Sequence, residues 1–135
     1  MRTQKRAGKG CLVRLLLDTQ ILVWLVTGDK RLRRVWIDLI GNTVTELNVS
    51  AVVAFEYADL QSRKRIPLDE PITELVERFD LRLLAFPAGA WRWIERLGDI
   101  HRDPIDRMLV AHALEDDFML MTADESLRRY PANFV

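Results

Sequence analysis

The chain has 135 residues, 49% hydrophobic and 30% charged, values that are ordinary for one globular domain. Its 20 basic and 20 acidic side chains balance overall, but residues 1–10 hold four basic side chains and no acid. The remainder has 16 basic against 20 acidic side chains, a formal charge of −4, which excludes a nucleic-acid-binding surface spread over the whole domain. Cys11 is the only cysteine, which excludes an intrachain disulfide and a zinc–cysteine cluster.

The composition changes after residue 10, and this change sets the expected domain boundary. Residues 1–10 are basic, lack large apolar side chains and contain two glycines, so we expect a disordered basic arm followed by a single domain over residues 11–135. A basic start followed by an apolar run is also typical of a secretory signal, but Arg14 interrupts the run and Asp18 ends it. No apolar run approaches the roughly 20 residues of a membrane span, and we expect a cytoplasmic protein.

The first half of the chain alternates predicted strands and helices. Residues 12–17 are mostly large aliphatics, which suits a strand buried on both faces of a parallel sheet. An apolar helix over 19–26 ends at a Gly-Asp pair, and a second helix over 32–40 has apolar residues at helical spacing. The β-branched run 43–49 predicts the next strand, and Ser50 is a suitable N-cap for a helix over 51–65.

The second half continues the alternation. A helix over 71–79, a strand over 81–86 and a helix over 91–97 precede a long helix that begins after Asp103. Pro104 suits the first position of that helix, which makes Asp103 its N-cap. A strand over 118–122, a short helix around Ser126 and an edge strand at 133–135 follow. This order predicts a three-layer α/β/α fold of the α/β class, around a mainly parallel sheet of four to five strands.

Acidic residues occur where parallel sheets bind ligands, beyond the carboxyl ends of the strands. Asp18 and Asp124 each follow a predicted strand, whereas Glu56 and Asp106 lie in adjoining helices. Glu56 has mostly apolar neighbours, where a carboxylate is costly unless it is paired or binds a metal. Converging carboxylates raise one another's pKa, and a divalent cation relieves their repulsion. Oxygen ligands favour Mg²⁺ or Mn²⁺ over zinc. The simpler alternative to a metal site is that Asp103 and Asp106 only cap a helix and suit its dipole.

Several segments carry a resemblance to a known family. They are Leu15-Leu16-Leu17-Asp18-Thr19, Val49-Ser50-Ala51 with Glu56, the more specific string HRDPIDRMLVA at 101–111, and Thr122-Ala123-Asp124. Over residues 12–130 the chain resembles the PIN-domain ribonucleases, and most closely the VapC toxins of bacterial toxin–antitoxin pairs. The resemblance implies Mg²⁺ or Mn²⁺ bound through Asp18, Glu56, Asp106 and Asp124, and cleavage of RNA by metal-assisted hydrolysis. It also implies a cognate antitoxin and a homodimer.

The chain departs from the family pattern at a few positions. Gln20 stands where close relatives often have His, His112 where they often have Gln, and Tyr57-Ala58-Asp59 replaces aliphatic and basic residues. These changes bear on substrate preference more than on metal binding. In supporting roles, Asp103 either orients the site or caps its helix, and capping is the favoured interpretation. Thr19 and Thr122 bind a water or a phosphate, or simply satisfy the backbone at the strand ends.

Other functional interpretations are weaker. A dehalogenase-type phosphatase would need a second Asp where Gln20 stands, and a response-regulator receiver would need a Lys after a late strand, whereas no lysine follows Lys64. A non-catalytic PIN-like module that binds protein or RNA is the main alternative, and the complete set of acids argues against it.

Two kinds of surface are also expected. Three basic clusters can guide RNA phosphates, and we expect at most one to do so; they are residues 63–65, residues 30–34 and Arg128-Arg129. The helices near Trp24, Trp36 and Tyr57 carry many large apolar residues, so we expect an exposed apolar groove there that a partner fills.

Overall fold

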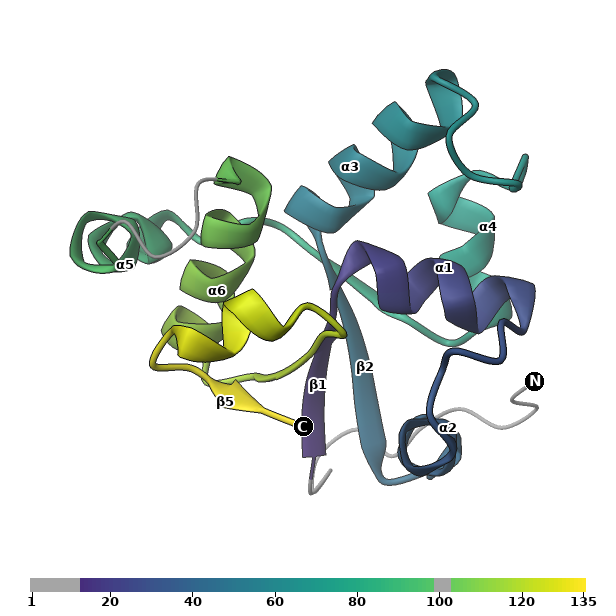
Figure 1. Cartoon of the computed structure of the whole chain (residues 1–135), viewed down its shortest axis with the longest axis horizontal. Coiled ribbons are helices and arrows are strands. Elements are labelled where there is room, and N and C mark those ends of the chain that lie inside the picture. Colours follow the sequence, from purple (N-terminus) through teal and green to yellow (C-terminus); the bar gives the residue numbers. More distant parts are fainter. Residues whose placement is uncertain (1–12, 99–102) are drawn as a thin grey trace.

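A computed structural model describes residues 13–98 and 103–135 and shows a parallel sheet with helices on both faces (Figure 1). The sheet has five strands in the order β3-β2-β1-β4-β5, and every neighbouring pair is parallel. The strands are β1 Val13–Leu17, β2 Thr45–Ser50, β3 Arg82–Leu84, β4 Met119–Met121 and β5 Asn133–Phe134. The α-helices are α1 Thr19–Thr27, α2 Arg34–Gly41, α3 Ala51–Ser62, α4 Ile72–Arg78, α5 Trp91–Arg96 and α6 Pro104–Asp116. The predicted fold class is confirmed.

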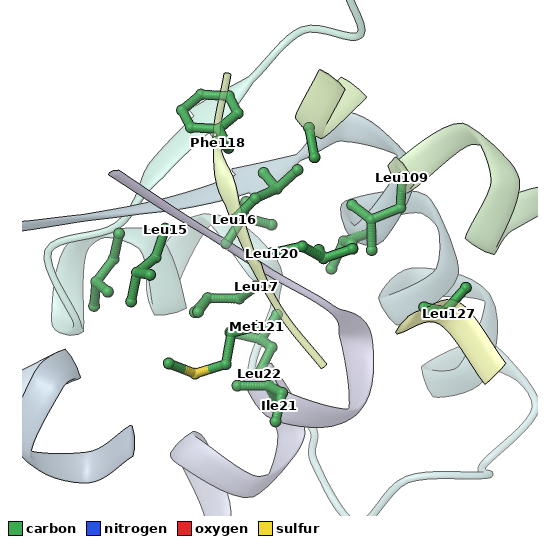
Figure 2. Close-up of a cluster of buried hydrophobic side chains, with 14 of the residues drawn as sticks. Leu15, Leu16, Leu17, Ile21, Leu22, Leu109, Phe118, Leu120, Met121 and Leu127 are labelled. Atoms are coloured by element: carbon green, nitrogen blue, oxygen red, sulfur yellow. The ribbon is translucent and has the colours of Figure 1, made fainter. Parts of the chain in front are cut away.

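The central strand β1 forms the middle of the hydrophobic core. Leu15, Leu16 and Leu17 are fully buried, which requires apolar cover on both faces of the sheet. The register pairs Leu16 with Leu120 and Leu17 with Met121, so the paired side chains share a face. Figure 2 shows Leu120 beside Leu109 and Leu127 on one side, and Met121 beside Ile21 and Leu22 on the other; all these residues belong to one buried cluster. Burying each such side chain stabilises the fold by about 2 kcal/mol.

The strands on the two sides of β1 are added in opposite directions across the sheet. From β1 the chain proceeds outward through β2 to β3, and then returns through α6 to β4 on the opposite side of β1. Right-handed crossovers therefore place α1, α2 and α4 on one face and α5 and α6 on the other, as Figure 1 shows. Helix α3 packs against both α1 and α6. The gap between the carboxyl ends of β1 and β4 is thus the switch point at which such sheets bind ligands.

Most predicted elements occur with shifted boundaries. Helix α3 ends at Ser62 rather than at residue 65, because Lys64 adopts a left-handed φ of 55°, which breaks the helix. The short helix around Ser126 is a 3₁₀ turn, η2 Glu125–Arg129, and a second 3₁₀ turn, η1 Ala88–Ala90, precedes α5. Strand β5 confirms the predicted edge strand. The basic arm 1–10 lies outside the described residues.

The expected apolar groove was placed at the helices that carry Trp24, Trp36 and Tyr57, and these three residues themselves belong to the core. Trp36 and Tyr57 are buried in the core and Trp24 is 9% exposed, so their large apolar area serves the fold itself. Among the described residues, the exposed large apolar side chains are Val35, Ile37, Phe55, Leu83 and Trp91, of which the first three lie on α2 and α3. The predicted groove therefore stays a prediction. Over residues 13–98 and 103–135, no helix combines the length and the apolar composition needed to cross a membrane.

Candidate active site

An acidic pocket of about 450 Å³ opens at the switch point between β1 and β4. Five carboxylate side chains line it, and no basic side chain does so among the described residues. The carboxylates are Asp18, Glu56, Asp103, Asp106 and Asp124. The structure therefore brings the four acids of the predicted site, and the supporting Asp103, to the wall of one pocket. We call this cavity the acidic pocket.

Asp18 lies where β1 ends and α1 begins. Its backbone N–H donates to the carbonyl of Met121 at 3.1 Å, which extends the pairing of β1 with β4 by one residue. Its carboxylate caps α1 by accepting from the N–H of Ile21 at 2.8 Å. The hydroxyl of Thr122, at the end of β4, hydrogen-bonds the same carboxylate. Asp18 is thus fixed by three neighbours while it lines the pocket, although it is only 8% exposed.

Thr19 and Glu56 form a second pair at the pocket. The Thr19 hydroxyl donates a hydrogen bond to the Glu56 carboxylate. Thr19 is buried in the first turn of α1, and Glu56 is half-buried on α3, so this bond joins the two helices across the pocket. The partner of the Thr19 hydroxyl is thus a side chain, whereas the two expected roles were binding a water or phosphate and satisfying the backbone.

Two further acids cap helical segments at the pocket. Asp103 accepts from the N–H of Ile105 at 2.9 Å and from the N–H of Asp106 at 3.4 Å, so the predicted N-cap of α6 is confirmed. Asp124 caps η2 by accepting from the N–H and the hydroxyl of Ser126 at 2.9 and 2.6 Å. Asp106 lies half-buried in the first turn of α6, where the positive end of the helix dipole favours an anion.

The electrostatics of the pocket disfavour the charged form of Asp18. The pKa of Asp18 is raised from an ordinary value of 3.8 to about 6, mainly by burial and in smaller part by the charges of Glu56 and Asp124. The hydrogen bonds from Thr122 and Ile21 act in the opposite direction but do not cancel the effect. A group of carboxylates held together at such a cost is typical of a functional site rather than of a structural one.

The donor set of the acidic pocket suits a hard divalent cation. Carboxylate and hydroxyl oxygens are the ligands that Mg²⁺ and Mn²⁺ prefer. As the described side chains stand, however, no three Asp, Glu, His or Cys residues are arranged closely enough to hold a metal ion. Glu56, Asp103 and Asp124 each direct a carboxylate to a protein donor. The chemistry of the donors fits a cation, and the geometry requires these side chains to turn.

One buried contact was not predicted from the sequence. Ser50 caps α3 as expected, accepting from the N–H of Val52 at 3.1 Å, but its hydroxyl also lies 2.8 Å from Nδ1 of His112 on α6. His112 is fully buried, and its Nε2 lies 3.3 Å from the Asp116 carboxylate. Only the substitution of His for Gln at position 112 signalled a special environment in the sequence. His101 and Arg102 of the family-like string lie outside the described residues.

The PIN domain family matches the chain over residues 15–133, so the chain belongs to the PIN-domain family. Ribonuclease VapC22 of Mycobacterium tuberculosis is 29% identical over 119 residues, which cover 86% of this chain and 91% of that protein. Among solved structures, VapBC2 from Rickettsia felis bound to a DNA fragment from its promoter is similar with a TM-score of 0.64 and 16% identity, covering 91% of this chain and 98% of that one. VapBC-1 from nontypeable Haemophilus influenzae gives a TM-score of 0.60 and 16% identity, covering 91% and 97%.

Proposed function

We propose that this PIN-domain protein is a metal-dependent endoribonuclease, with the acidic pocket as its active site. The observation that carries the proposal is the convergence of five carboxylates at the sheet's switch point with no basic side chain among the described residues that line it. The similarity to a VapC ribonuclease supports RNA as the substrate. The resemblance to VapC toxins further supports the toxin of a toxin–antitoxin pair.

The proposed roles follow from where each acid lies. Asp18 and Asp106 hold the cation directly, because one is fixed at the strand end and the other lies where α6 begins. Glu56 and Asp124 bind it directly or through water. Thr122 fixes the Asp18 carboxylate, Thr19 fixes Glu56, and Asp103 sets the start of α6 and thereby the position of Asp106. When bound, Mg²⁺ or Mn²⁺ lowers the pKa of a bound water and polarises a phosphate oxygen.

The test is cleavage of RNA by the purified protein with Mg²⁺ or Mn²⁺, with and without a chelator. Asp18→Asn keeps the shape of the side chain but removes a ligand charge, so we expect cleavage to fall at least about 100-fold, and calorimetry to show much weaker cation binding. Asp38→Asn, on the exposed surface of α2, is the matched control and should leave both unchanged.

Equal cleavage by the wild type and Asp18→Asn would contradict the proposed site. If the wild type neither binds a divalent cation nor cuts RNA, the alternative of a non-catalytic PIN-like binding module replaces the proposal.

The proposed partners are RNA, a cognate antitoxin and a second copy of the chain. The solved structures with the same fold include VapBC assemblies, which supports an antitoxin as partner. A homodimer rests on the family resemblance.

A further inference from the structure

A second cavity continues the acidic pocket along α1. This cavity, the basic pocket, has a volume of about 380 Å³. It shares Gln20, Val23, Trp24 and Ile66 with the wall of the acidic pocket. Its charged lining differs in sign, because it holds two arginines, Arg31 and Arg65, and a single acid, Asp29. A ligand that extends from the acidic pocket along α1 therefore passes from a wall of carboxylates to a wall with a net positive charge.

Arg31 is already neutralised within the protein. Its guanidinium hydrogen-bonds both carboxylate oxygens of Asp29, at 3.1 Å through Nε and at 2.7 Å through Nη2. These bonds hold the pKa of the Asp29 carboxyl down at about 2. Arg31 also lies over the ring of Trp24, 5.0 Å from its centre. A pair fixed in this way shapes the pocket wall but has little charge to offer a ligand.

Arg65 supplies the positive charge that is not compensated. Its side chain is exposed and forms no ion pair or hydrogen bond with any residue in the part of the chain that the structure describes. The backbone before it is well fixed: Lys64 donates to the carbonyl of Gln61 at 3.0 Å, and Arg65 donates to that of Leu60 at 2.9 Å. The left-handed turn at Lys64 thus directs the chain so that Arg65 lines the basic pocket.

We propose that the basic pocket binds a phosphate group next to the one that is cleaved, in an RNA strand that runs along α1, and that Arg65 is the residue that holds it. The inference rests on the proposed nuclease function of the acidic pocket. An RNA strand carries one negative charge per nucleotide, so a strand with one phosphate at the acidic pocket must place another nearby. A planar guanidinium with free donors is well suited to that phosphate.

The matched neighbour Arg63 provides the control. It belongs to the same basic cluster and is exposed, but it pairs with Asp59 at 3.3 Å and lines neither pocket. Arg65→Ala should raise KM for a short RNA about tenfold, as expected for the loss of one charged hydrogen bond, with little change in kcat. The slope of log KM against log salt should fall by about 0.7, the value for one phosphate contact on a single strand. Arg63→Ala should change KM less than twofold, and Arg65→Lys should restore most of the loss.

A chemical substitution in the RNA locates the contact. The phosphates on each side of the cleavage position are replaced one at a time by a neutral methylphosphonate, and KM is measured for the wild type and for Arg65→Ala. At one neighbouring position the neutral group should raise KM about tenfold for the wild type and should add nothing for Arg65→Ala.

If the wild type cuts RNA but Arg65→Ala behaves like Arg63→Ala, or its penalty is the same on every methylphosphonate substrate, the subsite is overturned while the nuclease function stands. If the wild type cuts no RNA with either cation, the proposed function is overturned and the subsite with it.

Discussion

Asp18 illustrates at the scale of one residue how a site can oppose the stability of its own fold. The side chain caps α1 and is nearly buried, yet it faces two other acids across the pocket. Its pKa of about 6 in the folded protein exceeds the ordinary 3.8, so the folded state disfavours the charged form. The free energy of unfolding therefore falls as pH rises from about 4 to about 6, and the cost is fully present above that range.

Asp18→Asn should accordingly stabilise the metal-free protein. A shift of about two pKa units corresponds to about 3 kcal/mol, and we expect about 2 kcal/mol at pH 7.5, because the amide is a weaker cap than the carboxylate. The gap between the two proteins should shrink as pH falls from about 6 and close below 3.8, where Asp18 is protonated in both states of the wild type. Denaturant unfolding in the presence of a chelator measures this difference. A variant less stable than the wild type at pH 7.5 would mean that Asp18 is mainly a structural cap.

At the scale of elements, the buried contact between Ser50 and His112 joins the start of α3 to the middle of α6. These helices carry Glu56 and Asp106, whereas neither Ser50 nor His112 lines the acidic pocket. Nε2 of His112 faces Asp116 at ion-pair distance but makes no well-aligned hydrogen bond. Burial lowers the pKa of His112, and the Asp116 charge offsets this in part. The neutral imidazole is therefore the form that the fold stabilises.

His112→Leu should destabilise the protein by about 2 kcal/mol at pH 8, because the Ser50 hydroxyl loses a buried partner. His112→Gln can keep that hydrogen bond and should cost about half as much. Because the folded pKa of His112 lies below 6.5, its contribution is complete above 6.5 and is lost as pH falls through the folded value.

Thermal melts of the three proteins between pH 5 and pH 8 follow this contribution. The wild type should lose its advantage over His112→Gln in acid. A constant difference across this range would contradict a buried neutral histidine. Asp18 is present in all three proteins, so its contribution cancels when their stabilities are compared. That contribution falls as pH rises, whereas the contribution of His112 rises.

At the scale of the whole molecule, several large apolar side chains lie at the surface of different elements. Val35 on α2, Phe55 on α3 and Trp91 on α5 are 63%, 64% and 53% exposed. Covering such side chains in an interface removes apolar area from water and favours association. The proposed homodimer and antitoxin complex would provide that cover.

Co-expression with the product of the adjacent gene should therefore yield a complex that stays together through affinity purification and gel filtration. Light scattering on the chain alone should give twice its mass of 15.7 kDa. The chain expressed with an unrelated small protein is the control. A monomer that co-purifies with nothing in either case would contradict both proposed partners.

The sequence by itself determined the order of the strands and helices, the capping role of Asp103 and the acids that follow β1 and β4. These features depend on local patterns: runs of aliphatic residues, a Pro after an Asp, and polar residues where an apolar run stops. The HRDPIDR string also contributed, because its residues are contiguous in the chain. Local features of this kind need no knowledge of what packs against them.

Only the tertiary structure decided which distant residues meet. That α3 stops at Ser62, so that Arg65 lines a pocket next to the acids, depends on a turn at Lys64 that no sequence pattern marked. The burial of Trp24, Trp36 and Tyr57 depends on how α1, α2 and α3 cover the sheet, and composition alone does not distinguish a core from an exposed groove. The bond between Ser50 and His112 joins residues 62 positions apart, and such contacts exist only once the helices have packed.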